Sequence, residues 1–329
     1  MRLPAVRTGD AAPILAVPIL LLAALPAMGF ADWLTLSASG LAMGMLLFLM
    51  ASGLTLIFGL MDVLNFAHGA FVGFGAFIAA SVWARLPGFV AAPGLAANLL
   101  ALVAAGGAAA LVCGGLGLAF ERVVIRRVYG AHLRQILITV GAMIVAEQMS
   151  VVIWGPDALT LAKPASLASS FIVAGGAVEK FRLVAAGLGL AAFLALRLVL
   201  ARTRIGLVVR AGVEDREMVE ALGYRVRRLF VFVFAVGTAL AGVGGAMWAV
   251  YAGTVTAALG GELTVLLFTV VVIGGLGSVS GSFLGALLVG LITNYVGFLA
   301  PKLALLSNVA LMAAVLLWRP RGLLPLVRT

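Results

Sequence analysis

Charged residues are scarce in this chain of 329 residues: they make up 10% of it, whereas hydrophobic residues make up 64%. Apolar stretches of about 18 or more residues recur from one end to the other, and each is long enough to cross a hydrocarbon core of about 30 Å as a helix. Because lipid offers the backbone no hydrogen-bond partner, such a chain has to be helical across the bilayer. The composition therefore predicts an all-α membrane protein, a polytopic helical bundle, and excludes a soluble fold.

Residues that build catalytic and metal sites are also nearly missing. The single cysteine, Cys113, lies in an apolar run, which excludes a disulfide framework and a thiolate metal site. The two histidines, His68 and His132, lie far apart, and neither begins a metal motif. The sequence has no Gly-x4-Gly-Lys-Ser/Thr phosphate loop. We therefore expect no enzyme and no cofactor in this chain; if ATP drives its activity, ATP and Mg²⁺ bind to another polypeptide.

What is present is a series of about ten apolar segments. They lie near residues 13–30, 36–60, 64–84, 93–119, 133–154, 182–200, 229–252, 263–275, 283–299 and 303–318. The eighth segment is short and adjoins a Gly/Ser run at 274–281, which indicates a broken or re-entrant helix. The 41 glycines suit close helix packing in lipid. We expect one transmembrane domain over residues 1–329, with residues 1–35 as an N-terminal extension that holds the first helix.

The first apolar run could also be a signal peptide, because Arg2 and Arg7 precede it. It lacks a convincing small-x-small cleavage site, and removing it would conflict with the charge distribution described next. We therefore favour a retained helix.

Lys and Arg are distributed unevenly between the two sides. With the N-terminus inside, sixteen of the 22 Lys and Arg residues fall in cytoplasmic segments. This positive-inside bias places both termini in the cytoplasm. It also explains the net charge of +10 without nucleic-acid binding, since basic segments face anionic lipid.

Eleven charged residues lie close together in the segment 201–228, between long apolar spans. Within it the sequence predicts a short amphipathic helix, with Asp215 as a candidate N-cap and Gly223 as a C-terminal stop. The apolar stripe of this helix consists of Met218, Val219 and Leu222. Two interpretations stay open: a docking surface for a partner, or an ordinary positive-inside loop.

Three polar residues lie in or near the membrane between the second and third spans. Asp62 is a candidate N-cap of the third helix, and Asn65 and His68 would then lie on one face of its first turns. Gly69 would allow close packing or leave room for a ligand. These residues either line a transport path or cap a tightly packed helix start.

Glu147 is the one carboxylate clearly inside a span. A charged residue at the centre of a membrane helix costs about 2.5–3.5 kcal/mol on insertion scales, so Glu147 is expected to face a partner or a wet cavity. A functional role and a role in interhelical contact are both open.

A weak internal repeat links residues 68–73 and 280–285, which share Gly-x-Phe-x-Gly. Paired glycine-interrupted segments are typical of transporters built from repeats. The start of a half-helix near Asn65 or Gly281 could attract a substrate carboxylate. Gly281 is therefore a further candidate for the path.

The sequence resembles the permease subunits of branched-chain amino-acid ABC importers, of the LivH type rather than its LivM-type partner. The resemblance runs in order from about residue 36 to the C-terminus. It rests on Asn65-Phe-Ala-His-Gly69, Thr203-Arg-Ile-Gly206, Arg210-Ala211, Glu214-Asp215, Ala221-Leu-Gly223, Ile273-Gly-Gly-Leu-Gly-Ser278, Gly281, Gly285 and Arg319-Pro-Arg-Gly-Leu323. Two features depart from the pattern: the thirty-five residues before the first block are a longer N-terminal stretch than the family leads us to expect, and the segment 154–180 carries no motif that indicates a substrate.

The resemblance implies a transmembrane permease in the bacterial inner (cytoplasmic) membrane. The implied partners are a second, LivM-like permease, two cytosolic ATPase subunits and a periplasmic substrate-binding protein. The segment 214–223 would be the coupling helix that contacts an ATPase. Its candidate residues are Glu214, Asp215, Arg216, Glu217, Met218, Glu220, Ala221 and Gly223.

Alternatives remain for the substrate and for the class of transporter. The same importer class carries urea, short amides and aromatic or carboxylic acids. An ion-coupled secondary transporter would need several carboxylates facing one cavity, whereas this chain has only Glu147 clearly within a span, and Asp62 near an edge. A structural scaffold would not need a capped cytoplasmic helix or a polar Asn/His face.

Overall fold

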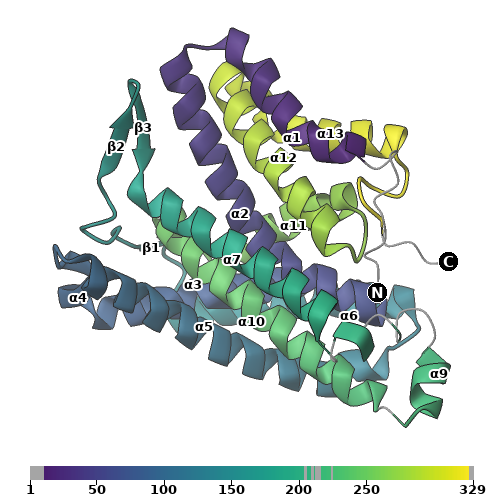
Figure 1. Cartoon of the computed structure of the whole chain (residues 1–329). Helices are drawn as coiled ribbons and strands as arrows, with labels where there is room; N and C mark the ends of the chain where they lie inside the picture. The colour runs from purple at the N-terminus through teal and green to yellow at the C-terminus, as the bar shows by residue number, and fades with distance from the viewer. Residues whose placement is uncertain (1–10, 204–205, 209–210, 212–215, 224, 326–329) are drawn as a thin grey trace.

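A computed structural model of the chain describes residues 11–203, 206–208, 211, 216–223 and 225–325 (Figure 1). Long apolar helices make up most of it. They are α1 (Ala11–Ala24), α2 (Phe30–Met61), α3 (His68–Arg85), α5 (Leu95–Val123), α6 (His132–Trp154), α7 (Lys180–Arg202), α10 (Val226–Ala252), α11 (Leu259–Gly274), α12 (Val279–Leu299) and α13 (Ala304–Trp318). Two short helices, α4 (Pro87–Ala91) and α9 (Arg216–Ala221), lie in the connections.

The helices confirm the predicted all-α membrane fold, because each of the ten apolar segments corresponds to one long helix. Among the described residues, six helices are long and apolar enough to cross a membrane: α2, α5, α6, α7, α10 and α12. The predicted short eighth segment is α11, a continuous helix of 16 residues and therefore about 24 Å long. The chain is a multi-pass membrane protein.

Helix α10 lies at the centre of the bundle, against α2, α3 and α5. The contacts are between backbones. A Cβ atom added at Gly53 of α2 would lie 2.0 Å from the carbonyl oxygen of Gly237 in α10, and one at Gly245 of α10 would lie 2.0 Å from that of Val72 in α3. Small residues allow this close approach, which is how helices gain contact energy in lipid.

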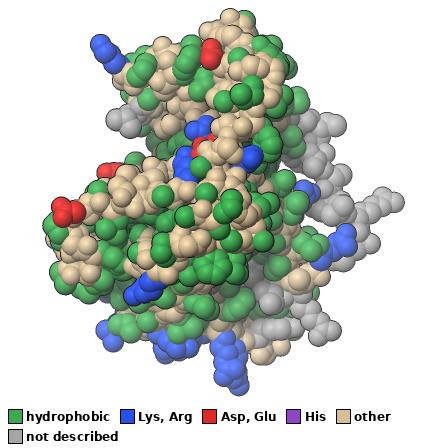
Figure 2. Space-filling view, turned by 90° about the vertical axis from the view of Figure 1, so that its left-hand side faces the viewer, with side chains coloured by type: hydrophobic (Ala, Val, Ile, Leu, Met, Phe, Trp, Pro, Cys, Tyr) green, Lys and Arg blue, Asp and Glu red, His purple; other side chains and the backbone are tan. Residues whose placement is uncertain are grey.

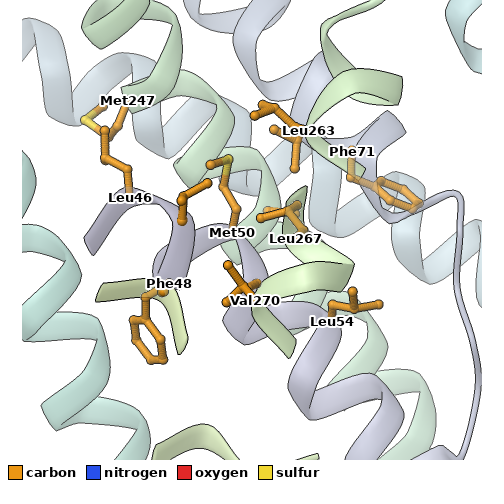
Figure 3. Close-up of a cluster of buried hydrophobic side chains, with 14 of the residues drawn as sticks. Leu46, Phe48, Met50, Leu54, Phe71, Met247, Leu263, Leu267 and Val270 are labelled. Atoms are coloured by element: carbon orange, nitrogen blue, oxygen red, sulfur yellow. The ribbon is translucent and has the colours of Figure 1, made fainter. Parts of the chain in front are cut away.

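The buried core lies between α2, α3, α10 and α11. Figure 3 shows its apolar side chains, which come from all four helices. Leu46 and Met50 of α2 and Leu267 of α11 are fully buried. Because α2 and α12 also pack along their length at Gly44 and Gly290, α2 is enclosed from several sides.

The connections at one end of the bundle form two small β structures. Strands β2 (Ser170–Val173) and β3 (Gly176–Glu179) form a hairpin with a two-residue turn, and β1 (Leu159–Thr160) pairs with β4 (Thr254–Val255). The turn residues Ala174 and Gly175 both have positive φ, as a type I′ hairpin turn requires. The hairpin and α4 lie at the left of Figure 1, whereas α9 and the described ends of the chain lie at the right.

This arrangement accords with the charge distribution. The segments expected in the cytoplasm contact one another at the right-hand end: Asp62 lies 3.9 Å from His132, and the N–H of Leu323 donates to the carbonyl of Ile273. The sidedness of the membrane itself stays a prediction.

The structure corrects the expected role of Asp62 as an N-cap. The apolar run continues through Met61, so α2 extends further than predicted and Asp62 is its C-cap, in the left-handed conformation at φ 51°. Its N–H donates to the carbonyl of Phe58 at 2.9 Å. Aspartate tolerates this conformation better than most side chains. Helix α3 begins only at His68, so Asn65 lies in the turn before it and not on its first turn.

Candidate functional site

Helix α9 is the predicted helix of the charged segment, and its apolar residues point in two directions. Val219 is buried, whereas Met218 and Leu222 are 58% and 68% exposed. The last two stand four residues apart and so share one face of a helical turn. The helix ends at Ala221, Leu222 follows directly, and the predicted stop, Gly223, lies in the turn after it with φ 85°. One face of α9 therefore holds it to the protein, and the other presents apolar side chains to the outside.

The structure describes only some of the candidate coupling residues. Glu214 and Asp215 lie outside the described residues, and for Arg216 and Glu217 only the backbone of α9 is described. The other four candidates are exposed: Met218, Glu220, Ala221 and Gly223. Because α10 begins at Val226, this surface is joined within a few residues to the central helix of the bundle.

The turn between α2 and α3 buries Asn65 and His68 completely. His68 Nε2 lies 3.0 Å from the carbonyl oxygen of Met50, while its Nδ1 has no hydrogen-bond partner among the described residues. In the same part of the chain, neither the oxygen nor the nitrogen of the Asn65 amide has a partner. Buried polar groups are rarely left unsatisfied, so this amide is a candidate for binding something that the fold itself does not supply.

Two neighbouring helices hold this turn in place. On α6, Thr139 Oγ1 accepts a hydrogen bond from the N–H of Phe66 at 3.2 Å. On α11, Gly260 meets Gly69 so closely that a Cβ at Gly69 would lie 1.9 Å from Thr264 Oγ1. The structure thus brings Asn65, His68 and Gly69 together where α2, α3, α6 and α11 meet. For Gly69 this contact is packing against α11.

Glu147 lies on α6, about 12 Å along the helix from Thr139 toward the β-structured end. Its side chain is half-buried, and the neighbouring Gln148 is exposed. A Cβ at Gly261 of α11 would lie 3.9 Å from Glu147 Oε2. No ion pair of Glu147 occurs within the described ranges. Both polar side chains are at membrane depth on a helix that contacts its own chain little, mainly α3 and α11.

An apolar pocket of about 300 Å³ lies between parts of α3, α5 and α6. Its lining includes Phe71, Phe120 and Ala146. This pocket lies on one side of α6, and exposed apolar residues lie on the other. Among the six candidate spans, only α7 is less buried than α6. Helix α6 is held near one end by Thr139 and at the other by Trp154, whose indole N–H donates to Ser81 Oγ at 2.8 Å and whose ring stacks on Phe77.

Gly281 lies apart from the Asn65 cluster in its contacts. A Cβ there would lie 2.0 Å from the carbonyl oxygen of Gly274, and Leu324 O follows at 3.0 Å. The N–H of Gly281 donates to Ser278 Oγ, which caps α12. This glycine therefore allows α12 to pack on the end of α11.

Two polar clusters were missed by reasoning from the sequence. At the β-structured end, Glu179 pairs with Lys163 at 2.6 Å and with Arg182 at 3.4 Å, and Arg182 also bonds to Ser39 Oγ and lies over the ring of Tyr251. Figure 2 faces this end and shows basic and acidic side chains gathered near its middle. The spacing of Glu179 and Arg182, three apart, was the available signal.

The other missed residue is Glu121, which is fully buried near the end of α5. It was overlooked because Arg122, Arg126 and Arg127 follow it, and charges at the end of a span are ordinarily solvated. Its hydrogen bond to Tyr129 brings together residues eight apart across a turn, which no helical spacing reveals.

Comparison with known proteins gives consistent matches. Residues 36–317 match the family described as the permease component of branched-chain amino acid transport systems. The permease protein BraD of a high-affinity branched-chain amino acid transport system in Pseudomonas aeruginosa is 28% identical over 292 residues, which cover 87% of this chain and 94% of BraD. LivH of Escherichia coli K12, described in the same words, is 28% identical over 298 residues, or 87% and 93% of the two chains. No solved structure matches the chain.

Proposed function

This chain belongs to the permease components of branched-chain amino acid transport systems, and on that premise we propose that it forms part of the translocation path of an ABC importer for branched-chain amino acids. Its relatives BraD and LivH are named as permeases of such systems and are matched over nearly their whole length. ATP hydrolysis then belongs to two separate cytosolic ATPases, and a periplasmic binding protein delivers the substrate. A second, LivM-like permease completes the membrane part in the bacterial inner membrane, with both termini of this chain in the cytoplasm.

The observation that carries this proposal is the surface of α9. The six-residue helix exposes Met218 and is followed at once by the exposed Leu222, while Val219 is buried. Exposed apolar side chains outside the membrane are typical of docking sites. Since the sequence lacks a phosphate loop and α9 leads directly into α10, an ATPase bound here could move the central helix of the permease.

Substitution in α9 and directly after it tests this proposal. Leu222→Glu places a charge in the apolar contact, and we expect ATP-driven uptake to fall on the order of tenfold at unchanged membrane abundance, because a lost anchor residue costs about 1–2 kcal/mol. Glu217→Arg and Glu214→Arg should uncouple transport in the same way. Leu207→Glu is the matched control, since Leu207 is 56% exposed in the same charged segment but outside α9.

Cross-linking identifies the partner directly. Single cysteines at positions 214–222 should cross-link to the ATPase of the same transport system in at least one nucleotide state. If no position cross-links in any state, α9 is not the docking site.

We place the translocation path along α6, at its boundary with the second permease. A half-buried carboxylate and an exposed amide at membrane depth cannot face lipid without a large cost, so protein or water has to cover Glu147 and Gln148. The Asn65 turn, which is attached to α6 through Thr139, would lie at the inner end of this path.

Two experiments distinguish the proposed function from an importer of other substrates and from another class of transporter. Urea, short amides or aromatic acids would replace branched-chain amino acids in stimulating ATP hydrolysis by the reconstituted importer with its binding protein. An ion-coupled secondary transporter would carry out gradient-driven uptake as the purified chain alone, which we do not expect.

A further inference from the structure

The buried carboxylate of Glu121 makes one side-chain hydrogen bond within the part of the chain that the structure describes. Its Oε1 accepts from the hydroxyl of Tyr129 at 2.5 Å, and its Oε2 has no hydrogen-bond partner among the described residues. Burying a carboxylate is costly unless it is well paired, so this side chain adds little to stability where it stands. Holding Tyr129 in one orientation would explain why Glu121 is buried there.

Tyr129 is held against the first turns of α10. Its ring packs edge-on against that of Phe230, with the centroids 5.7 Å apart. Phe230 is the fifth residue of α10, which follows α9 after a short connection. One turn further along α10, Phe234 contacts Phe120, the residue next to Glu121, at 6.2 Å. The Glu121–Tyr129 pair therefore lies where a displacement of α9 first enters the bundle.

A second set of contacts leads from this pair to the α2–α3 turn. Gln135 Nε2 donates to the carbonyl of Val128, the neighbour of Tyr129, at 3.1 Å. Thr139, one turn further along α6, accepts the hydrogen bond of the Phe66 N–H. On the other side, Phe71 of α3 packs against Phe120 at 5.9 Å. Contiguous contacts thus join α10 to the turn that holds Asn65 and His68.

We propose that Glu121 and Tyr129 are positioning residues that fix the start of α10 to the segment leading to the α2–α3 turn, so that movement of α9 reaches the translocation path. The proposal rests on the function proposed above. The hydrogen bond orients the Tyr129 ring against Phe230. Without it this orientation is less firmly fixed, and movement of α10 carries the turn less completely. ATP hydrolysis then continues while uptake per ATP falls.

Removal of the hydroxyl alone is the test. In proteoliposomes containing the complete importer, Tyr129→Phe should lower the number of substrate molecules imported per ATP by about fivefold or more, the usual size of coupling between distant sites. Glu121→Leu should act in the same direction, and the double variant should be no worse than the more impaired single one, because both changes remove the same hydrogen bond. Phe230→Leu, which removes the ring contact but leaves Glu121 intact, should lower the same ratio.

A matched control deletes a buried tyrosine hydroxyl elsewhere. Tyr295 is bonded to Ser37 Oγ at 2.6 Å near the β-structured end of α12, and Tyr295→Phe should leave the ratio unchanged. The proposal is overturned if Tyr129→Phe and Phe230→Leu import as much per ATP as the wild type, even with lower abundance or thermal stability. It is equally overturned if Tyr295→Phe lowers the ratio as much. Failure of the wild-type complex to import with ATP would instead contradict the proposed function.

Discussion

Asn65 combines complete burial with an amide whose two polar atoms have no partner in the described part of the chain. For packing alone, an apolar side chain of similar size would serve better, because an unsatisfied buried polar group costs about 1–3 kcal/mol. Asn65→Leu should therefore leave thermal stability and membrane abundance unchanged or higher. If the amide binds substrate or path water, uptake should fall on the order of tenfold, the value of one such hydrogen bond.

Measuring abundance, melting temperature and uptake on the same membranes separates the two roles of Asn65. A parallel fall of all three would show that the amide is structural. For His68, whose ring already bonds to Met50 O, we expect that structural outcome, because its substitution opens a buried contact.

Glu147 is best tested by a change of charge at constant shape. Neither an ion pair nor a side-chain hydrogen bond of Glu147 occurs within the residues described, so we expect its partner to be water or the second permease. We expect a hydrogen-bonding role, in which Glu147→Gln keeps uptake within about twofold, whereas Glu147→Leu lowers it about tenfold because leucine can neither donate nor accept a hydrogen bond. Strong loss in Glu147→Gln would reveal a charged role instead, such as binding the ammonium group of an amino acid.

The residue scale is where prediction from sequence reached its limit. A polar side chain in an apolar run can be recognised, as Asn65, His68 and Glu147 were, but its depth and partners depend on other helices. Glu121 shows the reverse: among basic neighbours it looks solvated, and only the fold of the turn toward Tyr129 buries it. Asp62 was wrongly predicted to be the N-cap of the third helix, because hydropathy does not show where a helix ends within a tight connection.

Among the elements, α10 owes its central position to glycine. Gly53→Ala would place a Cβ 2.0 Å from the carbonyl of Gly237, so α2 and α10 would have to separate. Overpacking of this kind costs about 1–3 kcal/mol, and we expect a lower melting temperature and lower abundance. Gly107→Ala on α5 is the control, because no atom lies within 4 Å of the added Cβ. There the substitution should be neutral or stabilising by up to about 1 kcal/mol. Equal losses in both variants would contradict the packing described for α10.

At the element scale the sequence was sufficient to predict that the ten long elements exist and that they are helices. A single apolar run that spans lipid can satisfy its backbone hydrogen bonds only as a helix. The helix bounds shifted where turns decide them: α2 passes its predicted end and α11 begins four residues earlier than expected. The two-stranded pairs were not predicted, since two to four residues of strand carry too little periodicity to recognise.

For the whole molecule, the two ends of the bundle should face opposite sides of the membrane. Because Cys113 is fully buried, we expect it to react little with a thiol reagent, so labelling of a single cysteine added elsewhere can be measured against a low background. A membrane-impermeant maleimide applied to intact spheroplasts should label Ile172→Cys in the hairpin, which is 80% exposed, and should label Leu222→Cys directly after α9 only after the membrane is opened. The reverse pattern would invert the proposed orientation.

The backbone contacts of α10 have a genetic consequence. Where two side chains meet, a damaging change on one helix can be rescued by a smaller residue on the other. At Gly53 and Gly245 the neighbouring atoms are carbonyl groups, which no substitution can shrink. A screen for second-site suppressors of Gly53→Ala should therefore yield true revertants, and few or no mutations at Gly237. Over evolutionary time these glycines would stay fixed while the side chains around them drift.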